Sequence, residues 1–129
     1  MPNRQKRKAA EKHARAARAV AVSPVLRMSA SKVRRIADLV RGLPAEQALV
    51  RCDFLPHRAA PLVKKALAEA MANAEENCGL DREDLQVSRI VVDEGFTIPR
   101  IRPRAQGRAY RIRKRTCKVT VEVAEREEE

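Results

Sequence analysis

The first predicted helix is marked by apolar residues at helical spacing. In SKVRRIADLVRG, the positions i, i+3, i+4 and i+7 are occupied by Val33, Ile36, Ala37 and Val40. Ser29 or Ser31 can cap the start of this helix, and Gly42 ends it. The segment is therefore predicted to be an amphipathic helix with one buried face.

Two further helices follow. Pro44 begins a short one through Ala45, Ala48 and Leu49, and a longer one runs from about residue 58 to residue 77. Gly79 is well placed to end the longer helix. Its apolar stripe is rich in alanine, which predicts close packing against another element: Val63, Ala66, Leu67, Ala70, Met71 and Ala74.

The apolar period then changes from helical to alternating. Residues 20–28 already suggest a short extended segment, which Pro24 places at a sheet edge. From residue 85 we expect a strand with Leu85, Val87 and Val91 on one face and Ile90 and Val92 on the other, followed by a loop from Asp93. In the last strand, apolar residues alternate strictly with polar ones, as in a half-buried strand: Cys117, Val119, Val121 and Val123.

A long basic segment, GFTIPRIRPRAQGRAYRIRKRTCK, separates these two strands. If residues 85–95 and 107–123 pair antiparallel, each arm of the hairpin extends ~40 Å at ~3.3 Å per residue, so part of it must project from a small core. Arg111, Arg113 and Arg115 occupy odd positions, like the apolar residues that follow, and would face the same side of an uninterrupted strand. Charged residues fit on that side only if the core ends by residue 115 or if a bulge intervenes. Gly95 and Gly107 are expected to bracket the tip.

The charge of the chain is unevenly distributed. The 129 residues carry a formal net charge of +11. Two segments are strongly basic, with +6 in residues 1–18 and +9 in residues 98–118. Residues 19–97 are balanced and residues 119–129 carry −4. We therefore expect a basic N-terminal extension (1–18) that is disordered when free, one domain (19–124) that includes the basic hairpin (about 93–117), and an acidic tail (125–129). A polyanion is the expected partner.

Residues suited to catalysis or metal binding do not gather in the sequence. The two histidines are far apart, and Cys52, Cys78 and Cys117 show no CxxC spacing, so they are interpreted as small buried or half-buried residues. No glycine-rich phosphate loop is present. The pair Asp93 and Glu94 is interpreted as a strand-end turn or a partner for the arginines. We expect no enzyme activity, no cofactor and no metal.

The expected compartment follows from similar arguments. No apolar run approaches the ~20 residues of a membrane-spanning helix. The N-terminus lacks the apolar stretch of a secretory signal. An odd number of cysteines indicates a reducing compartment.

Four motifs, in order and at characteristic spacing, resemble the family of large-subunit ribosomal protein twenty-two: LRMSASKVRRIADLVRG, FLPHRAAPLVKKALAEAMANAEEN, VDEG and IRPRAQGRAYRIRKRTCKVTVEV. They cover about residues 25–123. The resemblance implies an α+β fold, with three helices packed on a small antiparallel three-stranded sheet and a long protruding β-hairpin. The chain departs from the usual family pattern at Phe96, at Pro99 and in SASKVR.

The resemblance also implies a function. Members of the family are structural constituents of the large ribosomal subunit that bind its 23S-type rRNA, aid its assembly and place the hairpin along the nascent-peptide exit tunnel. The implied partners are large-subunit rRNA, other large-subunit proteins including ribosomal protein four, and the nascent peptide in transit. Neither membrane insertion nor homo-oligomerisation is expected. The implied location is the cytoplasmic ribosome, with an organellar ribosome as an open alternative.

The expected site residues are basic and lie on the first helix and the hairpin. For rRNA binding they are Lys32, Arg34, Arg35, Arg100, Arg102, Arg104, Arg108, Arg111, Arg113, Lys114, Arg115 and Lys118. The hairpin tip that lines the tunnel is expected at Ile98, Pro99, Arg100, Ile101 and Arg102.

One alternative from another class is an architectural DNA-binding protein that uses the hairpin as a basic arm. Such proteins usually dimerise and insert apolar wedges into DNA, a role open to Ile98 and Ile101. The sequence shows no evident dimer face. Preference for folded RNA over duplex DNA at matched salt separates the two hypotheses. An RNA-modifying enzyme lacks site residues, and an additional regulatory role outside the ribosome stays open.

Overall fold

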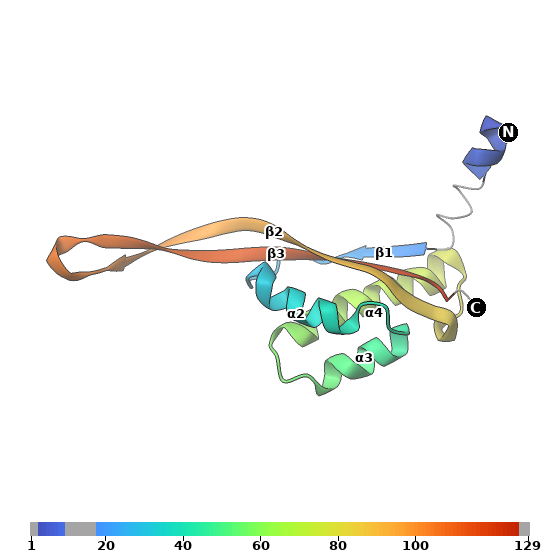
Figure 1. Ribbon diagram of the computed structural model, residues 1–129, viewed down its shortest axis with the longest axis horizontal. Coiled ribbons are helices and arrows are strands. Elements are labelled where there is room, and N and C mark those ends of the chain that lie inside the picture. Colours follow the sequence, from blue (N-terminus) through green and yellow to red (C-terminus); the bar gives the residue numbers. More distant parts are fainter. Residues whose placement is uncertain (1–2, 10–17, 127–129) are drawn as a thin grey trace.

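The protein has a helical layer packed on one face of a sheet. The computed structural model describes residues 3–9 and 18–126. After a short helix over residues 4–9, the elements are β1 (Arg18–Val22), α2 (Ala30–Val40), α3 (Ala45–Phe54), α4 (Ala59–Cys78), η1 (Arg82–Asp84), β2 (Leu85–Pro103), η2 (Ala105–Gly107) and β3 (Ala109–Glu125). Strands β2 and β3 project together far beyond the helices (Figure 1). The expected α+β fold with a protruding hairpin is confirmed.

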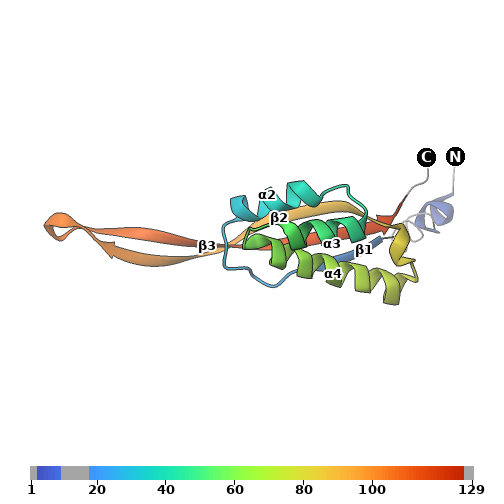
Figure 2. The same cartoon turned by 90° about the horizontal axis from the view of Figure 1, so that it is seen from below.

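The three helices lie on one face of the sheet, in front of it when the molecule is seen from below (Figure 2). All six residues of the predicted α4 stripe are buried, as are the four apolar positions of α2. Ser29 is the residue before α2, but its side chain makes no capping hydrogen bond there. Gly79 ends α4 in the left-handed conformation, with φ 64°, and its N–H donates to the carbonyl of Ala74. The core is therefore aliphatic and rich in alanine.

The sheet has the antiparallel order β1-β3-β2, so β3 is its central strand. Cys117, Val119, Val121 and Val123 of β3 are all fully buried, which confirms the predicted alternation. β1 lies at one edge of the sheet, as predicted for this segment, but it covers Arg18–Val22 rather than residues 20–28 and ends before Pro24. These strands supply the sheet side of the core.

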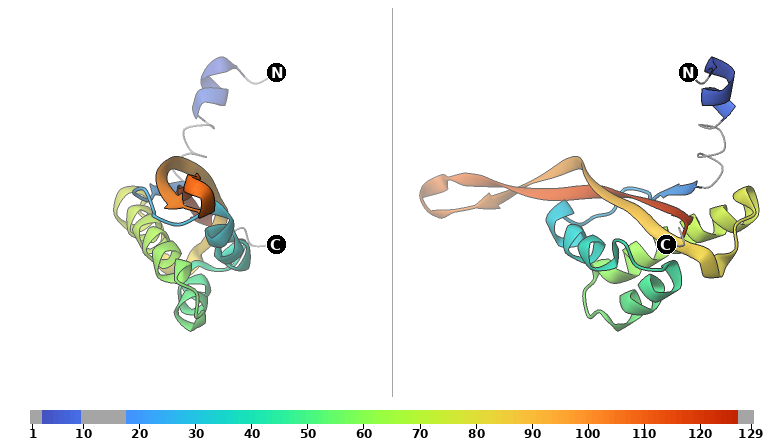
Figure 3. Two further views of the ribbon diagram at one scale, coloured as in Figure 1. Left: turned by 90° about the vertical axis from the view of Figure 1, so that its left-hand side faces the viewer. Right: turned by 45° about the vertical axis from the view of Figure 1, so that its right-hand side comes forward.

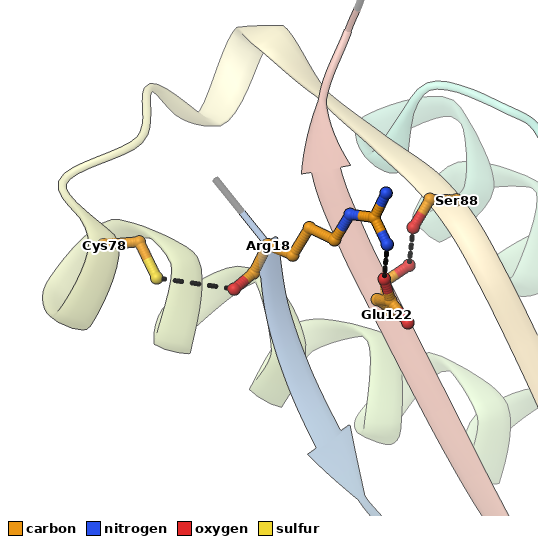
Figure 4. A network of polar contacts seen from close by, with 4 residues as sticks. All are labelled: Arg18, Cys78, Ser88 and Glu122. Atoms are coloured by element: carbon orange, nitrogen blue, oxygen red, sulfur yellow. Dashed lines mark hydrogen bonds and ion pairs between the residues drawn. The ribbon is translucent and has the colours of Figure 1, made fainter. Parts of the chain in front are cut away.

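Polar contacts attach β1 to its neighbours (Figure 4). Arg18 Nη1 donates to Glu122 Oε1 at 3.2 Å, and Cys78 Sγ donates to the carbonyl of Arg18 at 3.7 Å. Ser88 Oγ donates to the carbonyl of Glu122 at 3.0 Å from the other side of β3. The Arg18 side chain is exposed, so its ion pair contributes little to the stability of the fold.

The predicted division of the first part of β2 into two faces is wrong. Leu85, Val87, Ile90 and Val92 are all buried, whereas Val91 is only partly buried. The cause is a bulge, because Val87 lies opposite Val123 while Arg89 already lies opposite Glu122. One additional residue, Ser88, reverses the alternation and turns the next apolar residues back toward the core.

β2 also continues where a loop was expected from Asp93, because pairing with β3 extends to Pro103. A second bulge lies between Glu94, opposite Cys117, and Thr97, opposite Arg115. Thr116 occupies this bulge with 2% of its surface exposed, and its hydroxyl donates to the carbonyl of Phe96. The core therefore ends at this bulge.

The remaining part of the hairpin lies outside the core. Arg111, Arg113 and Arg115 are exposed. The expectation that the core has ended by residue 115 is therefore confirmed. Seen from its turn, the two-stranded ribbon twists strongly in front of the globular part (Figure 3). The hairpin is thus an arm on a folded base.

The hairpin closes at Ala105–Gly107, beyond the predicted tip. Arg104 N–H donates to the carbonyl of Arg108 at 2.7 Å, and Gln106 and Gly107 adopt φ of 62° and 70°. These left-handed conformations turn the chain within a few residues. Residues 98–102 therefore lie in the paired strand that leads to the turn, and Gly95 marks the second bulge, so it does not bracket the tip.

The two predicted extensions lie mainly outside the described residues. Of residues 1–18, the structure describes the helix at 4–9 and the start of β1 at Arg18. Of the acidic tail, Glu125 is the last residue of β3, opposite Leu85, and the N–H of Arg126 donates to the carbonyl of Asp84 at 2.7 Å. The disorder predicted for the N-terminal extension when free stays a prediction.

Candidate nucleic-acid interface

A cleft rich in positive charge lies where the hairpin leaves the globular part. It has a volume of about 780 Å³, and its lining holds eight lysines and arginines, His57 and no acidic residue. The eight are Arg27, Lys32, Arg35, Arg58, Arg100, Arg113, Lys114 and Arg115. We call this site the basic cleft. Because its charges repel one another, a polyanion is the ligand that it favours electrostatically.

Two helix starts supply one wall of the basic cleft. Lys32 and Arg35 lie three residues apart near the start of α2, where they are neighbours on the helix surface. Arg58 is the residue before α4 and follows His57 in the loop from α3. All four are exposed. The wall is therefore fixed by the packing of α2 against α4.

Arg27 reaches the basic cleft because the preceding residue is bonded to β3. Leu26 N–H donates to the carbonyl of Cys117 at 2.8 Å, and Cys117 N–H donates to the carbonyl of Leu26 at 3.0 Å. Leu26 is buried, whereas Arg27 is exposed. This bridge holds the segment before α2 beside the base of the hairpin.

The hairpin supplies the opposite wall and combines basic with apolar residues on both faces. Residues directly opposite in an antiparallel pair share a face. One face carries Ile98, Arg100 and Arg102 of β2 with Tyr110, Ile112 and Lys114 of β3, and the other carries Thr97, Pro99, Ile101 and Pro103 with Ala109, Arg111, Arg113 and Arg115. The ribbon can therefore contact an anionic partner on two sides.

Six of the twelve predicted rRNA-binding residues lie outside the basic cleft, and two of these, Arg34 and Lys118, also lie outside the hollow at the hairpin turn. Arg34 Nη2 donates to the carbonyl of Val92 at 2.9 Å and so connects α2 to β2. Lys118 is exposed and lies opposite Asp93 in the sheet. Both positions are close to the cleft in sequence, but the structure gives Arg34 a bond within the fold.

A second hollow lies at the hairpin turn. It has a volume of about 630 Å³ and is lined by Arg102, Arg104, Arg108 and Arg111, together with Ala105, Gln106, Tyr110 and Ile112. The predicted basic residues of the hairpin are therefore divided between two places, the basic cleft at its base and this turn hollow at its end.

The basic cleft also contains Arg27, His57 and Arg58, which the sequence did not predict as site residues. They come from connecting segments, where no apolar period shows which way a side chain points. The available signal was their position, since Arg58 directly precedes α4 and Arg27 lies two residues before Ser29, the N-cap of α2.

Within residues 3–9 and 18–126, no group of three or more His, Cys, Asp or Glu residues is placed to hold a metal ion. Over the same part of the chain, no helix is both long and apolar enough to cross a membrane.

The cysteines have the packing role that the sequence suggested. Cys52 and Cys117 are buried, Cys78 is half-buried, and all three are free. Burial raises the pKa of the Cys52 and Cys117 thiols, although the Lys64 and Arg34 charges, respectively, partly oppose this shift. Both thiols therefore stay protonated near neutral pH.

Comparisons with known proteins agree on one family. The family model described as Ribosomal protein L22p/L17e matches residues 21–124. The large ribosomal subunit protein uL22 of Trichodesmium erythraeum is 48% identical over 104 residues, which cover 81% of this chain and 87% of that protein. The large ribosomal subunit protein uL22 of Acidothermus cellulolyticus is 57% identical over 97 residues, which cover 71% of this chain and 34% of that longer protein.

Proposed function

We propose, since the chain belongs to the L22p/L17e family of ribosomal proteins, that it binds large-subunit rRNA through the basic cleft and the hairpin. Membership makes the chain a structural constituent of the large ribosomal subunit, and the family is not enzymatic. The resemblance drawn from the four sequence motifs is confirmed. The residues that contact RNA and the place of the hairpin belong to the proposal.

The observation that carries the proposal is the basic cleft, with eight basic residues and no acid in its lining. RNA phosphates neutralise such charges and release counterions, which supplies much of the binding free energy. Six of the eight are arginines, whose planar guanidinium groups form bidentate bonds to phosphate. The cleft therefore suits an RNA backbone that passes between α2 and the hairpin.

The arm beyond the cleft supports an RNA partner that surrounds it. Between residues 97 and 115, Ile98 and Ile112 are only half-buried and all other residues are exposed. A two-stranded ribbon with so little buried apolar surface is marginally stable alone. Contacts with RNA on both faces supply the missing interactions and favour its extended shape.

The finer parts of the proposal concern assembly and position. The hairpin passes between rRNA segments, which aids assembly, and residues 98–102 with the adjoining turn lie along the peptide exit tunnel. There they come near ribosomal protein four and the nascent peptide in transit. The protein acts as a single copy in the cytoplasmic ribosome.

A matched pair of lysine variants tests the basic cleft. Lys32 lines the cleft from α2, whereas Lys65 is exposed on α4 and is not part of the lining. Affinity for refolded large-subunit rRNA is measured by filter binding over a series of salt concentrations. Lys32→Gln is expected to weaken binding and to reduce the slope of log K against log salt by ~0.7–0.9. Lys65→Gln is the control and keeps the wild-type values.

Equal effects of the two variants would contradict the role of the cleft. Duplex DNA at matched salt tests the alternative function. If DNA binds as tightly as folded rRNA, the hairpin acts as an architectural DNA-binding arm and the proposal fails.

A further inference from the structure

The turn hollow holds the chain's single tyrosine among arginines. Tyr110 is 53% exposed and lines the hollow together with Arg102, Arg104, Arg108 and Arg111. An aromatic ring is otherwise rare in this protein, which has only two phenylalanines and no tryptophan. A flat apolar face thus lines the same hollow as four positive charges.

The hairpin geometry fixes this arrangement. Tyr110 lies directly opposite Arg102 in the strand pair, so the two side chains leave the ribbon on one face. The backbone bond of 2.7 Å from Arg104 to Arg108 closes the turn beside them. In the part of the chain that the structure describes, the side chains of the four arginines make no hydrogen bond or ion pair with protein groups. Their donors are therefore available to a ligand.

A nucleotide matches both features of the hollow. Its base stacks on an aromatic face, and its phosphate accepts hydrogen bonds from guanidinium groups. A polyanion without bases would use the arginines alone, and an apolar peptide would leave the arginine charges unpaired. A base within a duplex does not expose its face, so the base must be unpaired.

We propose that the turn hollow binds an unpaired RNA nucleotide, with its base stacked on Tyr110 and its phosphate held by the surrounding arginines. This inference rests on the proposed function and adds a stacking site to the phosphate contacts. It also distinguishes the roles of the two ends of the hairpin. The basic cleft binds RNA backbone, whereas the turn hollow binds a base as well.

The single tyrosine makes the test direct. Because the chain has one tyrosine and no tryptophan, its intrinsic fluorescence reports on Tyr110 alone. The full-length protein is titrated with a short single-stranded oligouridylate, and binding is followed independently by the anisotropy of a dye on the RNA. We expect tyrosine emission to be quenched in parallel with binding. Inorganic polyphosphate, which binds arginines but has no bases, is expected to leave the emission unchanged.

Affinity measurements complete the test. Tyr110→Ala is expected to weaken oligouridylate binding by about ten- to a hundred-fold without changing the salt slope, because a stacking contact is lost and no phosphate contact is. Tyr110→Phe keeps the stacking face and serves as the control, with near wild-type affinity.

The results separate the two proposals. RNA binding without quenching, and with Tyr110→Ala equal to wild type, overturns the stacking site while the proposed function stands. The stacking site is also overturned if polyphosphate quenches the tyrosine emission. The same holds if an apolar peptide quenches this emission and RNA does not. If the wild-type chain binds neither oligouridylate nor rRNA, the proposed function itself is contradicted.

Discussion

Replacing Gly95 with alanine tests how the hairpin is joined to the core. A Cβ atom at Gly95 would lie 2.6 Å from Thr116 Oγ1 and 3.5 Å from Thr116 Cβ. The hydroxyl cannot simply turn aside, because threonine is β-branched and Thr116 is 2% exposed. Its movement also breaks its hydrogen bond to the carbonyl of Phe96. The φ of Gly95 is not in the left-handed region, so the backbone itself accommodates alanine and the penalty arises at Thr116.

We expect Gly95→Ala to lower the free energy of unfolding by about 2–3 kcal/mol, from the lost hydrogen bond and local overpacking. For a domain of this size, Tm falls by roughly 8–12 °C. Urea denaturation followed by circular dichroism measures the effect.

A double-mutant cycle with Thr116→Ala isolates the cause. In the Thr116→Ala background the obstructing hydroxyl is absent, so adding Gly95→Ala is expected to cost less than about 1 kcal/mol. If the two losses simply add, or if Gly95→Ala leaves stability unchanged, then Thr116 does not shape the bulge and the reasoning is wrong.

Three further predictions concern the hairpin, α2 and the buried thiols. Replacing Thr97–Arg115 with Asn-Gly removes eight basic residues that lie outside the core. The Tm of thermal unfolding is therefore expected to stay within a few degrees of wild type, while rRNA affinity falls sharply. A molten globular part would contradict the picture of an arm on a folded base. Arg34→Gln removes the bond to the Val92 carbonyl and is expected to cost about 0.5–1.5 kcal/mol in urea denaturation, whereas Arg35→Gln, which lacks such a bond, leaves stability near wild type. Burial raises the pKa of Cys52 and Cys117 above the ordinary 9.0, so the unfolded chain ionises first as pH rises. Their contribution to stability is therefore full below about pH 9 and lost above it. The Cys52→Ala/Cys117→Ala double variant should show a shallower loss of stability between about pH 8 and about pH 10, and an unchanged slope would contradict this.

The helices were predictable because each buries one face against a single layer. The apolar positions of α2 and the alanine stripe of α4 are all buried, so local period and tertiary packing agree. The last strand was predictable for the same reason, since β3 is central and its odd positions from Cys117 to Val123 face the helices.

The failures occurred where tertiary structure breaks a local period. The bulge at Ser88 reverses the faces of β2, and the sequence contains no glycine or proline there to mark it. Gly95 did mark a backbone feature, but it allows close approach to Thr116 and is far from the turn. Strand pairing through Pro99 and Pro103 was hidden because prolines normally indicate an edge or an end. Both strands are edges of a free ribbon there, so prolines are tolerated.

The site was only partly predictable for a related reason. The alternating basic residues of the hairpin are visible in the sequence, and the structure exposes them. The basic cleft, however, depends on the Leu26 bridge to Cys117 and on the loop before α4, which bring Arg27 and Arg58 to the hairpin base. No spacing rule connects residues so far apart in sequence.

The most direct test of the central claim is sucrose-gradient sedimentation of a native lysate, probed for this chain. It is run at low salt and again at about 0.5 M salt, where exposed charges are screened. The proposal that RNA encloses the hairpin predicts co-migration with large ribosomal subunits in both gradients. Loss from the subunit peak at high salt, or migration with DNA, would contradict an integral place in the subunit.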